Sequence, residues 1–172
     1  STYNVGRFTE TFDACRREIP DLEPGDFHLN VAQTSGHYYG NAGMALMPEI
    51  GDVKAELKAY SSRRPVHSIG GWVERTFLRQ LDGFLETKRT PMRCHALRSS
   101  CFIDPWGTVD PCITWDRPIG SLRDTGMDLD PIWRSEKTRQ VQQDVWRGDC
   151  PQCWTACEAY QSILGNVLRP FQ

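Results

Sequence analysis

Apolar side chains recur at helical spacing in three stretches of the first half of the chain. The first stripe predicts a helix that buries one face and that Asn4 would cap; its apolar members are Val5, Phe8, Phe12, Cys15 and Ile19. Two further stripes, within residues 52–60 and 72–85, predict two more helices, each packed on one face.

Apolar and polar side chains alternate along residues 27–33, which is the two-residue period of a strand. This alternation predicts a strand with one apolar face, and the members of its two faces are Phe27, Leu29 and Val31 on one side and His28, Asn30 and Ala32 on the other. The loop that follows, residues 34–41, is rich in polar and aromatic groups. Such a loop either lines a substrate site or is an irregular surface connection.

A tight turn divides the extended pattern between residues 100 and 113. Residues 100–103 and 108–113 are expected to pair as a hairpin around Asp104-Pro105-Trp106-Gly107. Proline presets φ in this turn, and Gly107 accepts a positive φ. The hairpin would carry the chain back on itself and bring distant positions together.

Two helices are predicted after the hairpin. Residues 128–147 have the clearest pattern, with Asp130 placed to cap the helix and Gly148 placed to end it. Residues 155–168 predict a shorter helix that closes this half of the chain.

Composition and charge are those of an ordinary globular protein. The net charge of -2 gives no general electrostatic attraction to nucleic acid or to an anionic membrane. No apolar run approaches the length needed to span a membrane. We therefore expect a cytoplasmic protein whose partners include neither nucleic acid nor membrane.

Six of the seven cysteines lie in two groups, which are Cys94, Cys101 and Cys112, and then Cys150, Cys153 and Cys157. The C-x-x-C spacing of Cys150 and Cys153 directs two sulfurs towards one ion or cluster. Thiolate ligands favour an iron-sulfur cluster or zinc, and the spacing alone does not separate these two. A disulfide framework is the third possibility, although the cysteine count is odd.

The first cysteine group resembles the opening of the SPASM and twitch domains, which are C-terminal extensions of radical S-adenosylmethionine enzymes. The family pattern is a cysteine, a variable spacer, a glycine, four residues and a second cysteine, followed after a gap by a C-x-x-C group. Cys94, Gly107 and Cys112 match the opening, and Cys150 with Cys153 matches the later group. The Ile-Gly-Ser-Leu and Ile-Trp-Arg-Ser stretches between the two groups also resemble the family.

This resemblance implies an auxiliary 4Fe-4S cluster in a small α+β domain spanning residues 91–172, built from the hairpin and the helices. A full SPASM domain carries more cysteines, enough for two clusters, so the shorter twitch form with one cluster fits better. The implied ligands are Cys94, Cys112, Cys150 and Cys153. The alternative set of Cys94, Cys101, Cys112 and Cys157 resembles the first cluster of the longer form.

Radical S-adenosylmethionine enzymes hold their catalytic cluster through a C-x-x-x-C-x-x-C motif, which does not occur in this sequence. Residues 1–90 resemble the last part of the partial (β/α) barrel of those enzymes. The expected fold is therefore α/β, with a fragment of a partial barrel followed by the cluster domain. S-adenosylmethionine and a second 4Fe-4S cluster would be bound only in an intact enzyme that includes the missing N-terminal barrel portion.

The implied function is that of the C-terminal part of a radical S-adenosylmethionine oxidoreductase or maturase. Its auxiliary cluster would pass electrons to or from a substrate radical, and the chain is not expected to be active alone. The substrate would be a peptide or a small molecule that the sequence does not identify. The rival hypothesis is a non-enzymatic zinc-binding module that recognises another protein.

Candidates for a substrate or cofactor pocket follow from the barrel resemblance, since functional groups gather near the C-terminal ends of barrel strands. With the loop that follows the strand, the candidates are His28, Asn30, Gln33, His37 and Tyr38. Hydrogen-bonded polar residues without a catalytic role are the plainer interpretation.

Aromatic and acidic residues also lie near the cysteines in the sequence. The three tryptophans are interpreted as core residues, and they are Trp106, Trp115 and Trp154. The three carboxylates are interpreted as solvated, with adjustment of the charge around a cluster as the alternative role, and they are Asp110, Asp116 and Glu158.

Overall fold

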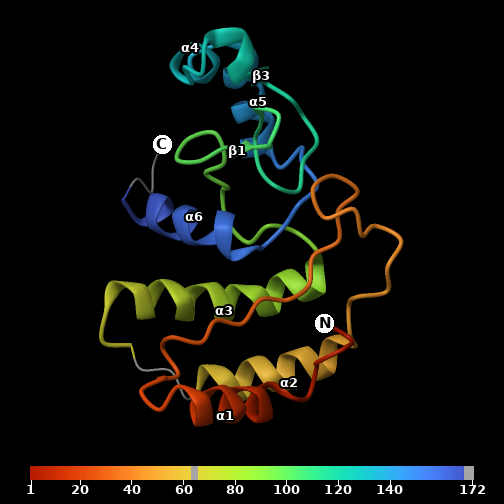
Figure 1. Ribbon diagram of the computed structural model, residues 1–172, viewed down its shortest axis with the longest axis vertical. Helices are drawn as coiled ribbons and strands as arrows, with labels where there is room; N and C mark the ends of the chain where they lie inside the picture. The colour runs from red at the N-terminus through yellow and green to blue at the C-terminus, as the bar shows by residue number, and fades with distance from the viewer. Residues whose placement is uncertain (63–65, 169–172) are drawn as a thin grey trace.

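The computed structural model describes residues 1–62 and 66–168 as layers of helices with a small antiparallel sheet at one end (Figure 1). The helices are α1 (Phe8–Glu18), α2 (Ile50–Ser61), α3 (Ile69–Thr87), α4 (Asp130–Trp133), α5 (Glu136–Arg147) and α6 (Ala156–Leu168). Helices α1 and α2 form one end, α3 crosses the middle, and α6 lies between α3 and the sheet. No helix among the described residues is both long enough and apolar enough to cross a membrane.

The three helices predicted in the first half are present, and α2 and α3 pack together through their apolar stripes. Helix α1 begins at Phe8 and Asn4 does not cap it, so this part of the prediction is wrong. The side-chain oxygen of Asn4 instead accepts a hydrogen bond of 3.0 Å from the amino group of Ser1. The competing local bond removes Asn4 from the helix terminus.

Residues 27–33 are extended and have the expected alternation of burial, but they do not form a strand of any sheet. Val31 is buried and packs against α2 and α3, while His28 and Asn30 are exposed. No backbone hydrogen bond joins residues 28–32 to another part of the described chain. The prediction of a strand is therefore wrong. A strand needs a neighbouring strand to pair with, and this segment packs on helices instead.

The hairpin is confirmed. Strands β1 (Phe102–Ile103) and β2 (Thr108–Asp110) pair antiparallel, with Phe102 opposite Asp110. In the turn Gly107 has φ +88°, and the Asp104 carboxylate accepts hydrogen bonds from two backbone N–H groups. A third strand that the sequence analysis did not predict, β3 (Gly120–Ser121), pairs with β2 and leads into a 3-10 turn, Leu122–Thr125.

The helix predicted for residues 128–147 is two helices, α4 and α5. The break falls at Ser135, whose hydroxyl accepts a 3.1 Å hydrogen bond from the Thr138 N–H and so caps α5. Gly148 ends α5 with φ +81°, as predicted. Asp130 is the first residue of α4 and not its cap.

The apolar side chains form three cores of unequal size. The largest joins α2, α3 and α6, and the ring of Trp154 stacks on Phe77 within it. The second core lies around the sheet, and its buried members are Leu97, Val109, Ile119, Leu122, Ile132 and Val141. The third contains Ala96, Cys112 and Val145, with Cys94 packed against it. Helix α6 belongs to the second of the two parts that the sequence predicts. It nevertheless packs into the largest core together with α2 and α3 of the first part.

Candidate iron-sulfur site

Hydrogen bonds tie the two cysteine groups together. The Thr90 hydroxyl lies 3.1 Å from the carbonyl oxygen of Cys153 and 3.3 Å from its N–H. The Thr90 N–H donates to the side-chain oxygen of Gln152 at 2.9 Å. The segment that leads into Cys94 is therefore fixed against the C-x-x-C loop, although more than fifty residues separate them in the sequence.

Helix α6 holds the same segment from the other side. The His95 N–H donates to the Ser162 hydroxyl at 3.0 Å, and the Asn166 amide donates to the Arg93 carbonyl at 2.8 Å. The contact is close, because a Cβ added at Gly165 would lie 2.3 Å from the His95 ring. Cys94 is thus positioned by α6 and by the C-x-x-C loop.

Three thiols, those of Cys94, Cys112 and Cys153, influence one another electrostatically. Burial, with smaller contributions from Glu158, Cys153 and Cys112, raises the pKa of Cys94 to about 12. Burial likewise raises the pKa of Cys153 to about 12, with Cys112 adding to the effect. Burial also raises the pKa of Cys112. These sulfurs therefore share a water-poor environment that disfavours uncompensated thiolates.

Polar groups point at the sulfurs. The Ala96 N–H donates to the Cys94 sulfur at 3.4 Å, and the Thr114 hydroxyl lies 3.2 Å from the Cys112 sulfur. The Gln152 amide lies 3.5 Å from the Cys150 sulfur. Such donors stabilise a thiolate ligand and adjust the properties of a bound metal.

Cys150 does not belong to the buried group of three thiols, and it adjoins Cys94 through a cavity. It lines a cavity of about 330 Å³ together with Cys94, between residues 89–94 and the end of α5. Gln152, between the two cysteines of the C-x-x-C group, has a left-handed φ of 55° that turns the loop. Cys94 is the thiol that the cavity shares with the buried group of three.

The two remaining cysteines of the groups lie at the margin. Cys101 is half-buried, and burial followed by the charge of Glu158 raises its pKa. Cys157 is exposed. All seven cysteines are free, so the structure contains no disulfide framework. No three His, Cys, Asp or Glu side chains in the described residues stand close enough together to hold a metal ion.

Residues 94–168 match the family model of SPASM, an iron-sulfur cluster-binding domain. The match starts at Cys94 and includes every cysteine of the two groups. This part of the chain is therefore a SPASM domain, and iron-sulfur binding takes precedence over zinc and disulfides as the role of its cysteines. Searches of curated proteins and of solved structures gave no match.

The chemistry of these donors suits such a cluster, although the described side chains are not gathered closely enough to hold a metal in this structure. Fe–S clusters are held by cysteine thiolates, and metal binding supplies the positive charge that lets buried thiols lose their protons. The thiols of Cys94, Cys112, Cys150 and Cys153 are all free and at least partly buried. Cluster binding by such thiols would be coupled to proton release.

Two of the three nearby carboxylates are not solvated, contrary to the sequence interpretation. Asp110 is 1% exposed and accepts a 3.0 Å hydrogen bond from the Arg117 N–H, and burial raises its pKa. Glu158 is also buried, with a pKa raised by burial, and its charge acts on Cys94, Cys112 and Cys153. Asp116 is exposed as expected.

The tryptophan interpretation is right for Trp154 and wrong for Trp106. Trp154 is buried, and its indole N–H donates to the Phe77 carbonyl at 2.9 Å. Trp106 is 70% exposed because it lies at the tip of the hairpin. Trp115 is partly buried and packs against the core that contains Cys112.

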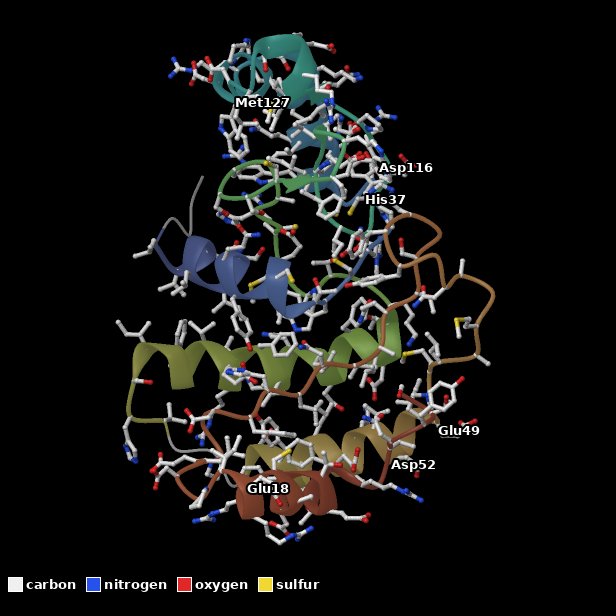
Figure 2. The ribbon with its side chains drawn as sticks, viewed as in Figure 1. Glu18, His37, Glu49, Asp52, Asp116 and Met127 are labelled. Carbon is white, nitrogen blue, oxygen red and sulfur yellow. The ribbon has the colours of Figure 1, made fainter. Side chains whose placement is uncertain are left out.

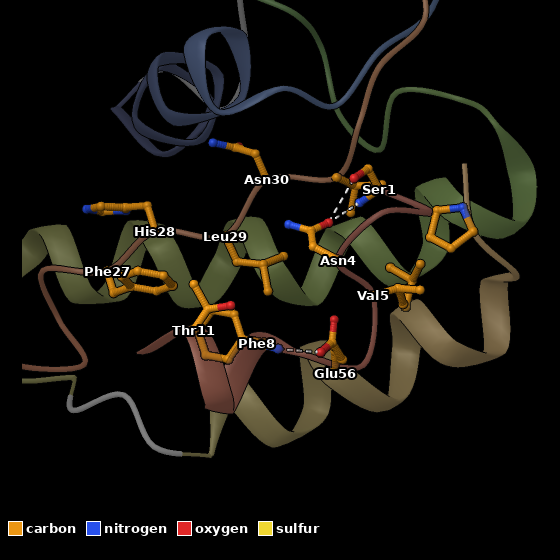
Figure 3. Close-up of a pocket in the computed structure, with 13 residues that line it drawn as sticks. Ser1, Asn4, Val5, Phe8, Thr11, Phe27, His28, Leu29, Asn30 and Glu56 are labelled. Carbon is orange, nitrogen blue, oxygen red and sulfur yellow. Dashed lines mark hydrogen bonds between the residues drawn. The ribbon is translucent and has the colours of Figure 1, made fainter. Parts of the chain in front are cut away.

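The five candidate pocket residues do not share one cavity. His28 and Asn30 line a pocket of about 180 Å³ beside α1 and α2, and Figure 3 shows their side chains on the opposite face of the segment from Phe27 and Leu29. The Gln33 carbonyl accepts a 3.0 Å hydrogen bond from Asn41 within the following loop.

His37 and Tyr38 lie at the other end of the loop, against the sheet. His37 stands between Asp110 and Asp116 at nitrogen–oxygen distances of 3.9 and 3.8 Å, and Figure 2 shows it beside Asp116. Tyr38 packs edge-on against Phe102 of β1. The loop therefore docks the first half of the chain onto the SPASM domain.

A polar cluster that the sequence analysis did not predict surrounds the buried carboxylate of Glu74. The Tyr160 hydroxyl donates to this carboxylate, and Nδ1 of His28 lies 3.4 Å from the same oxygen. Glu74 lies on the buried side of α3, and Tyr160 lies on α6. A charged residue within the apolar stripe of α3 was the available signal, but periodicity does not identify its partners.

Tyr160→Phe is expected to lower the free energy of unfolding by about 1–3 kcal/mol, because the buried Glu74 carboxylate loses a donor while the ring remains. Urea denaturation followed by circular dichroism measures the change. Tyr3→Phe is the matched control, since Tyr3 is 77% exposed. Equal stabilities of the two variants would contradict a stabilising role for this bond.

Proposed function

We propose that the SPASM domain binds one auxiliary 4Fe-4S cluster through Cys94, Cys112, Cys150 and Cys153. The cluster would pass electrons to or from a substrate radical, as part of a radical S-adenosylmethionine oxidoreductase or maturase. The observation that carries the ligand assignment is the position of Cys94. It interacts electrostatically with Cys112 and Cys153, and it lines one cavity with Cys150.

The alternative set replaces the C-x-x-C pair with Cys101 and Cys157. Burial and neighbouring charges favour the first set, because Cys157 is exposed and Cys101 interacts electrostatically with Glu158 and not with another thiol. Cys153, in contrast, lies in the same buried group as Cys112. One complete ligand set also agrees with a single cluster of the twitch type.

The chain's own residues would prepare the site for electron transfer. A cluster held by four cysteine ligands would supply one-electron transfer and would leave no coordination position for substrate. The Ala96 N–H and the Thr114 hydroxyl are placed to stabilise thiolates at Cys94 and Cys112. Trp115 and Trp154 would exclude water from the Cys112 and Cys153 sides.

The partner in this proposal is a barrel portion that pairs with residues 27–33. Backbone N–H and C=O groups of an extended segment are strong hydrogen-bonding groups that normally find partners. The backbone groups of residues 28–32 make no bond to other backbone of the described chain, although Val31, one of these residues, is buried. An adjacent strand would satisfy these groups, and its polypeptide would supply S-adenosylmethionine binding.

The first test is anaerobic purification of the full chain after iron and sulfide reconstitution. We expect a broad absorption band at about 400 nm and about four irons and four sulfides per chain. The same preparation is expected not to cleave S-adenosylmethionine, since the C-x-x-x-C-x-x-C motif is absent from the sequence. Absorption, metal analysis and product chromatography provide the three readouts.

A colourless protein that holds one zinc and no acid-labile sulfide would overturn the cluster assignment. It would support the zinc-binding recognition module instead. Cleavage of S-adenosylmethionine by the chain alone would overturn the proposal that a separate barrel portion is needed.

A further inference from the structure

Trp146 occupies the end of α5 beside the candidate cluster site. Its ring packs against the third core, which contains Cys112, and Cys94 packs against the same core. Trp146 also lines the cavity of about 330 Å³ with Cys94 and Cys150. The indole of Trp146 therefore lies near thiols of both cysteine groups.

The indole N–H of Trp146 is buried and has no hydrogen-bond partner among the described residues. Trp154 differs, because its N–H donates to the Phe77 carbonyl. Buried donors are almost always paired, so an unpaired one on a residue that lines a cavity with two candidate ligands indicates a missing acceptor. The acceptors that an iron-sulfur cluster brings are its sulfides and the thiolates that hold it.

Two arginines fix the orientation of this ring. The guanidinium carbon of Arg98 lies 3.4 Å from the ring centroid, and that of Arg93 lies 5.0 Å from it. Stacked guanidinium groups are attracted by the face of the ring and leave its edge available for donation. The N–H group is therefore held by the protein before any ligand arrives.

We propose that the indole N–H of Trp146 donates a hydrogen bond to a sulfur of the bound cluster, either a sulfide or a cysteine ligand, and thereby raises the cluster's reduction potential. This inference rests on the proposed function, since it needs a cluster at the cavity shared by Cys94 and Cys150. Reduction adds negative charge to the sulfurs, so a donor stabilises the reduced state more than the oxidised state. Trp146 is accordingly a positioning and tuning residue.

The test compares the reconstituted wild-type chain with Trp146→Phe. Phenylalanine keeps an aromatic ring beside the arginines and removes the N–H. We expect a midpoint potential more negative than that of the wild type in an anaerobic redox titration followed by electron paramagnetic resonance. Trp133→Phe is the control and is expected to leave the potential unchanged, because Trp133 packs against the second core and does not line the cavity.

Replacing Trp146 with 3-(benzothienyl)alanine gives a second variant of nearly identical shape, with sulfur in place of the N–H. This variant is expected to show the same negative shift of the midpoint potential. It tests the role of the N–H even if Trp146→Phe does not bind a cluster. A loaded cluster with wild-type potential in either variant would overturn this inference and leave the proposed function intact. A wild-type chain that binds no cluster would overturn both.

Discussion

Cys153→Ala is expected to abolish cluster binding, whereas Cys157→Ala is expected to preserve it. Cys153 lies among buried thiols beside Cys112, while Cys157 is exposed. Cys112→Ala should also abolish binding, because Cys112 belongs to both ligand sets that the family resemblance allows. Metal binding to thiolate sites contributes on the order of 10 kcal/mol, which is comparable with the whole stability of a domain. We therefore expect poorly soluble, colourless protein from Cys153→Ala and Cys112→Ala.

The measurements are iron per chain, visible absorption and soluble yield for the three variants. Cys15→Ala is the additional control, since Cys15 lies on α1, outside the SPASM domain. A full iron complement in Cys153→Ala or Cys112→Ala would remove that residue from the ligand set. Loss of iron in Cys157→Ala together with retention in Cys153→Ala would instead establish the alternative set.

Local patterns in the sequence predict most of the helices and the hairpin. Helical spacing locates α2, α3 and α6 because each of these helices buries one face, and periodicity reports that burial directly. Gly107 and Gly148 are recognised because the turn and the helix end need a positive φ. The C-x-x-C group is visible for a similar reason, since its chemistry depends on close spacing.

Features that depend on distant partners could not be predicted. Residues 27–33 have the alternation of a strand, but alternation does not reveal whether a neighbouring strand exists. Glu158 was expected to be solvated because carboxylates usually are, yet the fold buries it near three thiols. The Glu74–Tyr160 bond joins residues that are 86 positions apart.

The candidate site likewise combines features that local sequence predicts with contacts that it does not predict. Its cysteines are recognised from their spacing, whereas the groups that orient them come from elsewhere in the chain. Thr90 contacts Cys153 across 63 positions, and Ser162 holds His95 across 67. These contacts arise only when α6 packs between α3 and the sheet, so no local motif encodes them.

Removal of iron from the loaded chain is expected to unfold the sheet end while leaving α3 protected. The core around the sheet has six buried side chains, and thirteen buried residues make up the core that joins α2, α3 and α6. The smaller core depends more on the stabilisation from metal binding, which is on the order of 10 kcal/mol. Ferricyanide with a chelator would remove the iron, and hydrogen exchange followed by mass spectrometry would report protection by segment.

In the iron-free chain, amides of β2 and α5 should exchange rapidly and those of α3 slowly, because local opening follows the distribution of buried contacts. The loaded chain, treated identically without oxidant or chelator, is the control. Unchanged protection of β2 would show that the sheet end folds without the cluster. Simultaneous loss from α3 would contradict separate unfolding. It would mean that the segment before α6, where Cys153 bonds to Thr90 and Trp154 bonds to Phe77, makes the two ends one cooperative unit.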